Sequence, residues 1–366
     1  MKKIVFVSYS KSSQFTNPEE WLIRIRAYTG VPERLAEKHE VTSIEQISYK
    51  GEYRQNGVLY YFNNANKVNF YLPWALHHYI KNLQPLVIIV HGLIFPLQVI
   101  QLRASVGKDV KILVQNHAEK PASGYLKVLQ KLADRFINAY LFTSKEMGAE
   151  WITKKIIADP SKIQGVMEAS SSFYPMDKEL ARSKTFVTGE PSFLWVGRLD
   201  SNKNPLSVIH AFIEFRRSTP RAKLYMIYHT EELIGEIKQT LENHHATDGI
   251  LLCGNQSHDQ MLYWFNSADF IVSGSYYEGS GVAICEAMSC GCIPIVTDIP
   301  AFRKLTGNGA CGFLYEAGDS NALLSLFLKI PGLDLGNERQ QVIHQFRSVL
   351  SFEAIADRME EVINSL

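Results

Sequence analysis

Residues 269–297 read DFIVSGSYYEGSGVAICEAMSCGCIPIVT, and this stretch predicts a strand, a tight turn, a helix and a second strand. The segments 269–275 and 292–297 are short, apolar and rich in β-branched residues, which is typical of parallel strands buried on both faces. Gly279 and Gly281 permit a tight turn and a close backbone approach. The helix expected over 282–289 would point its first free amides at whatever fills the turn.

The turn and its helix have the features of a nucleotide site. Free amides and the helix dipole favour a phosphate, which a neighbouring carboxylate would repel. Glu286 lies about one turn into the helix, where it is better suited to accept hydrogen bonds from a vicinal diol, as acidic residues do for ribose in dinucleotide folds. The stretch therefore predicts a phosphate with a ribose attached.

A second motif in the same half supports this interpretation. The segment WVGRLDSNKN (195–204) follows a predicted strand, and it carries Arg198 and Lys203 at the strand end and at the start of the next helix. Two cations at the carboxyl edge of a sheet are placed to neutralise a diphosphate. Each motif alone is weak, because glycine turns and solvated basic caps are common, but their order within one domain is specific.

The whole chain alternates between strand and helix patterns, which predicts doubly wound α/β sheets. The expected strands are 3–8, 86–92, 110–117, 138–144, 193–197, 223–228, 250–254, 269–275 and 292–297, with a hairpin at QNGV inside 49–66. The expected helices are 18–38, 68–82, 124–136, 145–153, 204–217, 231–245, 258–267, 282–289, 319–329 and 351–366. We expect two Rossmann-like domains, 1–185 and 186–348, linked by the polar stretch 181–192 and facing each other across a cleft.

Composition bounds the class of protein. The 366 residues are 46% hydrophobic and 20% charged, which is typical of a globular protein of about two domains. The five cysteines lie in apolar surroundings in the second half, which favours reduced thiols and a cytoplasmic location. Residues 1–185 hold 25 Lys and Arg against 16 Asp and Glu, a net charge of +9, whereas the rest has −8. Either the first half meets an anionic partner, or the two halves attract each other.

The second half resembles the donor domain of retaining GT-B glycosyltransferases of family GT4, over residues 190–320. That family's pattern is matched in order by Gly197-Arg198-Leu199 with Lys203, by Gly254, by Ala268-Asp269 with Ser275, and by Glu278 and EAMSCGCIPIV (286–296). The resemblance implies a GT-B fold in which the terminal segment, 349–366, crosses back to the N-terminal domain.

The resemblance also implies roles for individual residues. Arg198 and Lys203 would hold the donor diphosphate and stabilise the leaving group, while Glu278 would contact the donor sugar. Glu286 would bind the ribose. The other nucleotide-binding positions would be Gly197, Gly254, Asn255, Gln256, Ser280, Gly281 and Val282.

The first half matches the family less closely. Its usual Gly-Gly loop after the first strand is replaced by SYSKSSQFTNPEE (8–20), where Ser8 to Gln14 could donate hydrogen bonds instead. His117 corresponds to a strand-end histidine that the family commonly carries near the donor sugar, so it is a catalytic candidate. His91 ends the preceding strand, and Glu168-Ala169 replaces the family's usual Asn-Gly.

The sequence thus predicts transfer of a sugar from a nucleotide-diphosphate sugar, expected to be UDP-linked, to an acceptor hydroxyl with retention. Polysaccharide, lipopolysaccharide or glycolipid assembly is the expected setting. We expect no metal, no other cofactor and no nucleic-acid partner, and the basic first half suggests peripheral contact with the inner face of the membrane. The alternatives are a nucleotide-sugar 2-epimerase, using His117 and Glu168 for proton transfer, and a catalytically degenerate binding protein.

Overall fold

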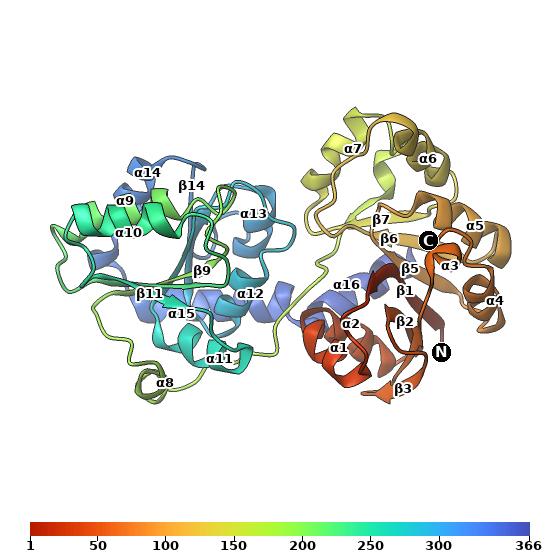
Figure 1. The fold of residues 1–366 in the computed structure, drawn as a ribbon, viewed down its shortest axis with the longest axis horizontal. Helices are drawn as coiled ribbons and strands as arrows, with labels where there is room; N and C mark the ends of the chain where they lie inside the picture. The colour runs from red at the N-terminus through yellow and green to blue at the C-terminus, as the bar shows by residue number, and fades with distance from the viewer. The chain divides into compact units, whose positions relative to one another are not determined.

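The computed structural model describes all residues, 1–366. The chain forms two compact units: unit 1 comprises Met1–Ser170 and Phe352–Leu366, and unit 2 comprises Ser171–Ser351 (Figure 1). The boundary between the units therefore precedes the expected position at 185/186. The stretch 181–192 was wrongly predicted to be a linker, because its first residues belong to helix α8 (Lys178–Thr185), whose Arg182 donates to the carbonyl of Ser267 within unit 2.

Unit 1 is built on an eight-stranded sheet in the order β3-β4-β2-β1-β5-β6-β7-β8, parallel except for β3. Its strands are β1 (Lys3–Ser12), β2 (Glu40–Ile47), β3 (Gly51–Gln55), β4 (Val58–Asn63), β5 (Val87–His91), β6 (Lys111–Gln115), β7 (Ala139–Phe142) and β8 (Ile163–Gly165). Its helices are α1 (Pro18–Arg24), α2 (Arg26–Ala36), α3 (Lys67–Tyr71), α4 (Trp74–Asn82), α5 (Pro96–Val106), α6 (Gly124–Asp134), α7 (Ala149–Thr153) and α16 (Phe352–Asn364), with 3-10 turns η1 (Lys145–Gly148) and η2 (Pro160–Lys162).

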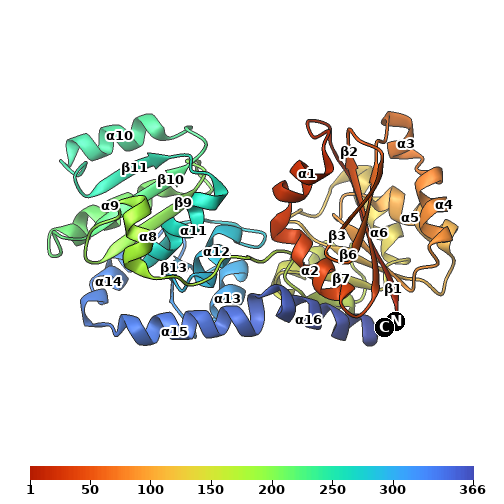
Figure 2. The same ribbon diagram turned by 90° about the horizontal axis from the view of Figure 1, so that it is seen from below.

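Helices cover both faces of this sheet. Helices α4, α5 and α6 pack side by side on one face, while α2 and α16 pack together on the other (Figures 1 and 2). Gly30 of α2 makes the second contact possible, because a Cβ there would lie 2.5 Å from the ring of Phe352. The contact is extended by an ion pair of 2.8 Å between Arg34 and Glu353.

Unit 2 is built on a six-stranded parallel sheet in the order β11-β10-β9-β12-β13-β14. Its strands are β9 (Ser192–Gly197), β10 (Lys223–Tyr228), β11 (Ile250–Gly254), β12 (Phe270–Ser273), β13 (Ile293–Thr297) and β14 (Phe313–Tyr315). Besides α8, its helices are α9 (Pro205–Arg216), α10 (Ile234–Asn243), α11 (His258–Ser267), α12 (Val282–Ser289), α13 (Pro300–Thr306), α14 (Ser320–Phe327), α15 (Leu335–Gln345), η3 (Ile330–Gly332) and the π-helical η4 (Phe346–Leu350). Figure 1 shows α9, α10 and α14 on one face of the sheet and α11, α12 and α15 on the other.

The doubly wound fold class is confirmed, and so is the hairpin at Asn56-Gly57, where both residues have positive φ and join antiparallel strands. Two expected helices are each divided in two. The pattern at 18–38 breaks at Ile25, whose dihedral angles (φ −103°, ψ 16°) are not helical. The pattern at 68–82 breaks before Pro73, because a proline lacks an amide hydrogen and restricts the residue before it. The sequence did not predict β2, β8, β14, α5, α8, α13 or α15.

Candidate functional site

The order of the strands in unit 2 reverses between β9 and β12. The chain proceeds from β9 to β10 and β11, and then returns to place β12 on the other side of β9. In open α/β sheets, ligands bind beyond the carboxyl ends of the strands at such a reversal. The loops that follow β9 and β12 contain Arg198, Lys203 and Glu278, so the fold brings these predicted site residues to one place.

The loop after β9 is held by its own polar contacts. The amide of Leu199 donates to Thr230 Oγ1 at 3.1 Å, and the amide of Lys203 donates to Asp200 Oδ1 at 2.9 Å. Arg198 Nε lies 3.2 Å from Asp200 Oδ2, and its side chain is 52% exposed. The guanidinium is therefore positioned by Asp200 but keeps an accessible face for an anion.

Lys203 and Glu278 form an ion pair, 75 residues apart in sequence. The hydroxyl of Ser275 also donates to Glu278, at 2.7 Å. The side chains of the pair are only 20% and 14% exposed, so each charge is partly desolvated and relies on the other. An incoming diphosphate would compete with Glu278 for the ammonium group of Lys203.

The start of helix α12 has the backbone geometry that the glycine-rich turn predicts. Gly281 is the N-cap and adopts a left-handed conformation (φ 63°, ψ 47°). A Cβ at this position would lie 2.8 Å from the ring of Phe302, so the site requires glycine for two reasons. The first intrahelical bonds come from the amides of Ile284 and Cys285, which leaves the amides of Val282 and Ala283 ahead of the helical ladder. Neighbouring Ser280 is 6% exposed.

Glu286 has a partner that the sequence did not reveal. His258, the first residue of α11, places Nε2 3.0 Å from Glu286 Oε1, and its ring packs at a tilt against that of Phe173, with centroids 4.5 Å apart. The imidazole thus fixes the carboxylate predicted to bind ribose. The available signal was a capping box, in which Ser257 and Gln260 start a helix directly after β11 and so place His258 at the strand edge.

The remaining predicted nucleotide positions lie at the same edge of the sheet. Gly254 ends β11 with φ 64°, and Asn255 beyond it is exposed. Gln256 instead turns toward its own loop, because its side chain donates to the Cys253 carbonyl at 2.9 Å and accepts from Trp264 Nε1 at 3.3 Å. Gly197 ends β9, close to Trp195 and the stem of Lys203.

Unit 1 places a second polar cluster at the ends of β5 and β6. His91 Nδ1 lies 2.9 Å from His117 Nε2, and His117 Nδ1 forms an ion pair with Glu168. Glu119 accepts from the amide of His117 at 2.6 Å. Gly92 permits this arrangement, since a Cβ there would lie 3.0 Å from Glu119 Oε1. The two expected strand-end histidines therefore belong to one hydrogen-bonded chain.

Burial gives the members of this cluster unusual pKa values. Desolvation, with a smaller effect from His117, lowers the pKa of His91 to about 3. Desolvation also acts to lower the pKa of His117, but the hydrogen bond and charge of Glu168 outweigh it, and the net pKa is raised. His91 is thus a neutral ring whose Nδ1 accepts the Nε2 proton of His117, while His117 Nδ1 donates to Glu168. Burial also raises the pKa of Glu119.

The cluster opens into a pocket of about 380 Å³ at the point where the strand order of unit 1 reverses between β1 and β5. In place of the expected loop, β1 continues to Ser12, with a register shift against β2 between Val7 and Lys11. This irregular stretch presents Ser8 and Ser10 to the pocket, so hydroxyl groups line the place of the family's glycines. Sequence reasoning also missed Glu45 of β2, which lines the pocket as well.

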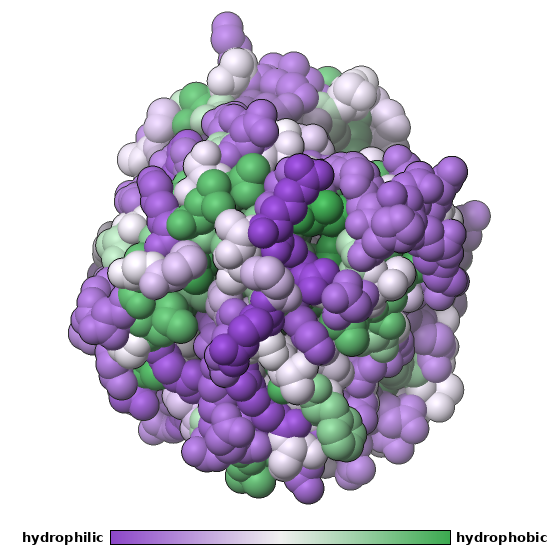
Figure 3. Space-filling model, turned by 90° about the vertical axis from the view of Figure 1, so that its left-hand side faces the viewer, coloured by the Kyte–Doolittle hydropathy of each residue, from purple (hydrophilic) through white to green (hydrophobic).

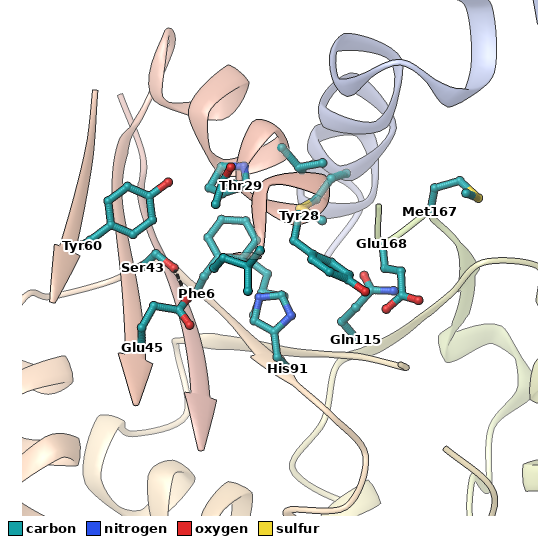
Figure 4. A pocket seen from close by; sticks show the side chains of 15 residues that line it. Phe6, Tyr28, Thr29, Ser43, Glu45, Tyr60, His91, Gln115, Met167 and Glu168 are labelled. Atoms are coloured by element: carbon teal, nitrogen blue, oxygen red, sulfur yellow. Dashed lines mark hydrogen bonds between the residues drawn. The ribbon is translucent and has the colours of Figure 1, made fainter. Parts of the chain in front are cut away.

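A smaller pocket of about 30 Å³ adjoins these residues (Figure 4). It is lined in part by Phe6, Tyr28, Glu45, His91 and Glu168, and the Tyr28 side chain in Figure 4 reaches toward Glu168. Burial, with the charge of Glu168, raises the pKa of Tyr28 to about 12, so its hydroxyl stays protonated.

Comparison with known proteins assigns the fold and the family. Residues 176–347 match the family model described as glycosyl transferases group 1. The GDP-mannose:cellobiosyl-diphosphopolyprenol alpha-mannosyltransferase of Xanthomonas campestris is 24% identical over 318 residues, which cover 82% of this chain and 77% of that protein.

Two solved structures share the fold of the whole chain. A glycosyltransferase from Rickettsia africae ESF-5 has a TM-score of 0.76 at 18% identity, over 100% of this chain and 98% of that one. Anabaena Alr3699/HepE in complex with UDP and glucose has a TM-score of 0.71 at 15% identity, over 100% of both chains. The fold is GT-B. The domain at residues 176–347 belongs to the glycosyl transferases group 1 family.

Proposed function

We propose that this glycosyltransferase moves a sugar from a nucleotide-diphosphate sugar to an acceptor hydroxyl with retention at the anomeric carbon. One observation carries the proposal: Arg198 and the Lys203–Glu278 pair lie at the strand-order reversal of unit 2, at the same sheet edge as the left-handed start of α12. This edge offers two permanent cations and free helix amides for phosphates.

The proposed chemistry follows from these charges. As the bond between the anomeric carbon and the diphosphate breaks, negative charge grows on the leaving oxygen. Arg198, Lys203 and the amides of Val282 and Ala283 stabilise that charge from fixed positions. Glu278, released from Lys203 by the diphosphate, accepts hydrogen bonds from the donor sugar. The acceptor hydroxyl attacks from the same face that the leaving group departs, which gives retention, and the hydroxyl proton passes to the departing phosphate oxygen. In this proposal the two cations and the helix amides act without a metal.

The donor is proposed to carry uridine, as in the Anabaena structure with UDP, although the Xanthomonas relative is named for GDP-mannose. A thermal-shift screen of UDP, GDP, ADP, CMP and their sugars would decide the base, because a ligand raises the midpoint in proportion to RT ln(1 + [L]/Kd). We expect one nucleotide diphosphate to stabilise the wild type but not Glu286→Ala. If none of them stabilises the wild type, the site is degenerate and the proposal is wrong.

The stereochemistry needs its own measurement. Proton NMR of the first product formed gives the anomeric coupling constant, which should match that of the donor sugar. Inversion would contradict the proposed same-face attack and would instead require a base on the acceptor side, of which the cluster in unit 1 offers several.

An epimerase remains the second candidate, favoured by the chain of titratable groups His91–His117–Glu168. Such an enzyme abstracts a proton from the donor sugar itself. Incubation with the donor alone, in deuterated water, separates the two functions. A new sugar that carries deuterium would indicate an epimerase, whereas an unchanged donor that is consumed only when an acceptor is added would indicate a transferase.

We further propose that the acceptor is lipid-linked and that unit 1 meets an anionic membrane surface, as in glycolipid or polysaccharide assembly. Tyr125, Val128 and Leu132 lie on one exposed face of α6, next to the cations Lys131 and Arg135. A second exposed apolar segment runs from the end of α3 to the start of α4, at Tyr71, Leu72 and Trp74. By contrast, the face of unit 2 drawn in Figure 3 is mostly hydrophilic, with apolar atoms in separate small groups. No helix is both long and apolar enough to span a bilayer.

Co-sedimentation with vesicles tests this membrane contact. We expect binding to vesicles rich in phosphatidylglycerol, weaker binding at 0.5 M salt, and loss of binding when Tyr125 and Val128 are both changed to Ser. The matched control changes Leu328, an exposed apolar residue of unit 2, to Ser. Binding that is insensitive to both salt and the double substitution would contradict the proposal.

A further inference from the structure

The pocket of about 380 Å³ in unit 1 has a lining that differs in kind from the cationic edge of unit 2. Its walls include Ser8 and Ser10 from the irregular stretch of β1, Trp21 and Tyr28 from α1 and α2, Glu45 from β2 and Phe95 before α5. The pocket is large enough for a small polar ligand. It combines aromatic surface with hydroxyl and carboxylate groups.

The charges around this pocket do not suit an anion. Two acidic groups line the pocket, the carboxyls of Glu45 and Glu119, together with two basic groups, the imidazoles of His91 and His117. Neither lysine nor arginine lines it. His91 is neutral, and His117 already shares its protons with Glu168 and His91. A phosphate would therefore meet two carboxyl groups and no unpaired cation, which costs free energy in a partly buried site.

Glu45 has acceptor capacity to spare. Its side chain is almost completely buried, and its residue is 6% exposed. One oxygen accepts from Ser43 Oγ at 2.9 Å and the other from Trp21 Nε1 at 3.1 Å, and no cation pairs with it. A carboxylate offers about four acceptor sites, so about two remain for donors from a ligand. Hydroxyl groups are the uncharged donors that would satisfy them.

Trp21 is held in a fixed orientation beside this carboxylate. Glu45 accepts its indole N–H, and Phe15 packs against its ring edge-on, with centroids 5.2 Å apart. The face of an aromatic ring is electron-rich and attracts polarised C–H groups. A sugar ring presents such C–H groups on one face and hydroxyls around its rim, so it would fit a flat aromatic surface beside a carboxylate.

We propose that this pocket binds an uncharged sugar ring of the acceptor, with Trp21 as its stacking surface and Glu45 as the hydrogen-bond acceptor that selects it. The inference names the acceptor class and rests on the proposed transfer function. A phosphate of a lipid-linked acceptor would then lie outside this pocket.

Saturation-transfer NMR on the full chain tests the proposal with methyl glycosides of glucose, galactose, mannose and N-acetylglucosamine, in the absence of nucleotide. We expect at least one glycoside to bind saturably and to quench the fluorescence contributed by Trp21. At pH 8, above the pKa of about 7 to which burial raises this carboxyl, Glu45→Gln should weaken binding about tenfold or more, because it loses the charge that strengthens hydrogen bonds. Glu20→Gln, an exposed change on the same helix as Trp21, is the matched control and should bind as the wild type does.

Several outcomes would overturn the inference. These are no saturable binding of any glycoside, equal binding by Glu45→Gln and the wild type, or displacement of the glycoside by inorganic pyrophosphate. A pH limb near 7 in kcat that disappears in Glu45→Gln without a change in acceptor KM would also overturn it, by assigning proton transfer to Glu45. The nucleotide screen is independent: if nucleotides bind and glycosides do not, only this inference fails, whereas glycoside binding without nucleotide binding refutes the proposed transfer function.

Discussion

In each of the two units the order of the strands reverses once, but the residues at the two reversals differ in their chemistry. In unit 2 the loops after β9 and β12 carry permanent charges at least partly open to solvent, Arg198 with Asp200 and Lys203 with Glu278. In unit 1 the corresponding position holds buried groups, such as Glu45 and His91, whose pKa values are shifted in the direction that favours the uncharged form of each group. Fixed cations suit a ligand that is always charged, whereas neutral and carboxyl groups suit one that offers hydroxyls.

The largest effect is expected when the fixed charges of unit 2 are removed, which tests whether they bind the charged ligand. We expect Arg198→Ala combined with Lys203→Ala to lower kcat/KM at least about a thousandfold, because both cations stabilise the leaving diphosphate. An assay of released nucleotide, with the donor base found in the screen, measures this. Arg217→Ala removes an exposed cation of the same unit and should have no effect. A loss of less than tenfold in the double variant would mean that the cations do not touch the leaving group.

The next largest effect concerns the stability of unit 1. Burial raises the pKa of Glu45 from 4.5 to about 7, so the folded state resists ionisation of this carboxyl. The protonated carboxyl therefore contributes its full share to the free energy of unfolding below the unfolded pKa. As pH rises from there to about 7, this contribution of about 3 kcal/mol is progressively lost. Glu45→Gln should therefore be more stable than the wild type at pH 8 and no more stable at pH 4.

Urea unfolding at the two pH values measures this difference, with Glu20→Gln as the exposed control. The same stabilisation of Glu45→Gln at both pH values would show that the effect comes from packing. Destabilisation at pH 8 would show that the ionised carboxylate is fully compensated by its hydrogen bonds to Ser43 and Trp21, contrary to the view that it has acceptor capacity to spare.

A smaller effect is expected for the histidine chain. Although burial opposes it, Glu168 raises the pKa of His117. In Glu168→Gln we expect the pKa of His117 to fall, because burial is then no longer outweighed by the carboxylate, and NMR of its imidazole nitrogens measures this. The stability that charged His117 contributes is present below the unfolded pKa and is lost as pH rises through the folded one, so the variant should lose stability mainly below about pH 6.5. An unchanged His117 titration would refute the ion pair.

The smallest expected effect concerns the contact between His258 and Glu286 in unit 2. His258→Phe removes the donor to Glu286 and should weaken binding of the nucleotide diphosphate by about fivefold, whereas His258→Gln keeps a donor and should bind nearly as well as the wild type. Isothermal titration with inorganic pyrophosphate provides the control, because pyrophosphate has no ribose and its affinity should not change. Equal losses for both ligands would place His258 at the phosphates.

The sequence predicted the segments of unit 2 that hold the candidate site because their signals are local, although it missed β14, α8, α13 and α15. Strand ends, Gly281 and the spacing of Arg198 and Lys203 are properties of neighbouring residues, and they retain their order in the family pattern. His258 was missed because its partner Glu286 lies 28 residues away, and only packing of α11 beside α12 joins them.

The strand of unit 1 that carries Glu45 was missed for a physical reason. Strand β2 was missed because its sequence EVTSIEQI has an apolar residue only at every third position, and the structure buries the polar residues between them, including Ser43, Glu45 and Gln46. Burial of polar side chains costs free energy, so they are placed in a core strand where they serve a site. The strand that carries Glu45 therefore has a weak hydrophobic pattern.

Helix α16 returns to unit 1 after the chain has completed unit 2, and this connectivity has a consequence for biosynthesis. On the ribosome, residues 171–351 emerge as one continuous segment and can fold before α16 exists. Until then the surface of α2 that α16 covers stays open, and Ile355, Met359 and Val362 have not yet been made. The unit whose synthesis begins first is thus the last to be finished, and a nascent chain stalled before residue 352 would expose it to aggregation and proteolysis.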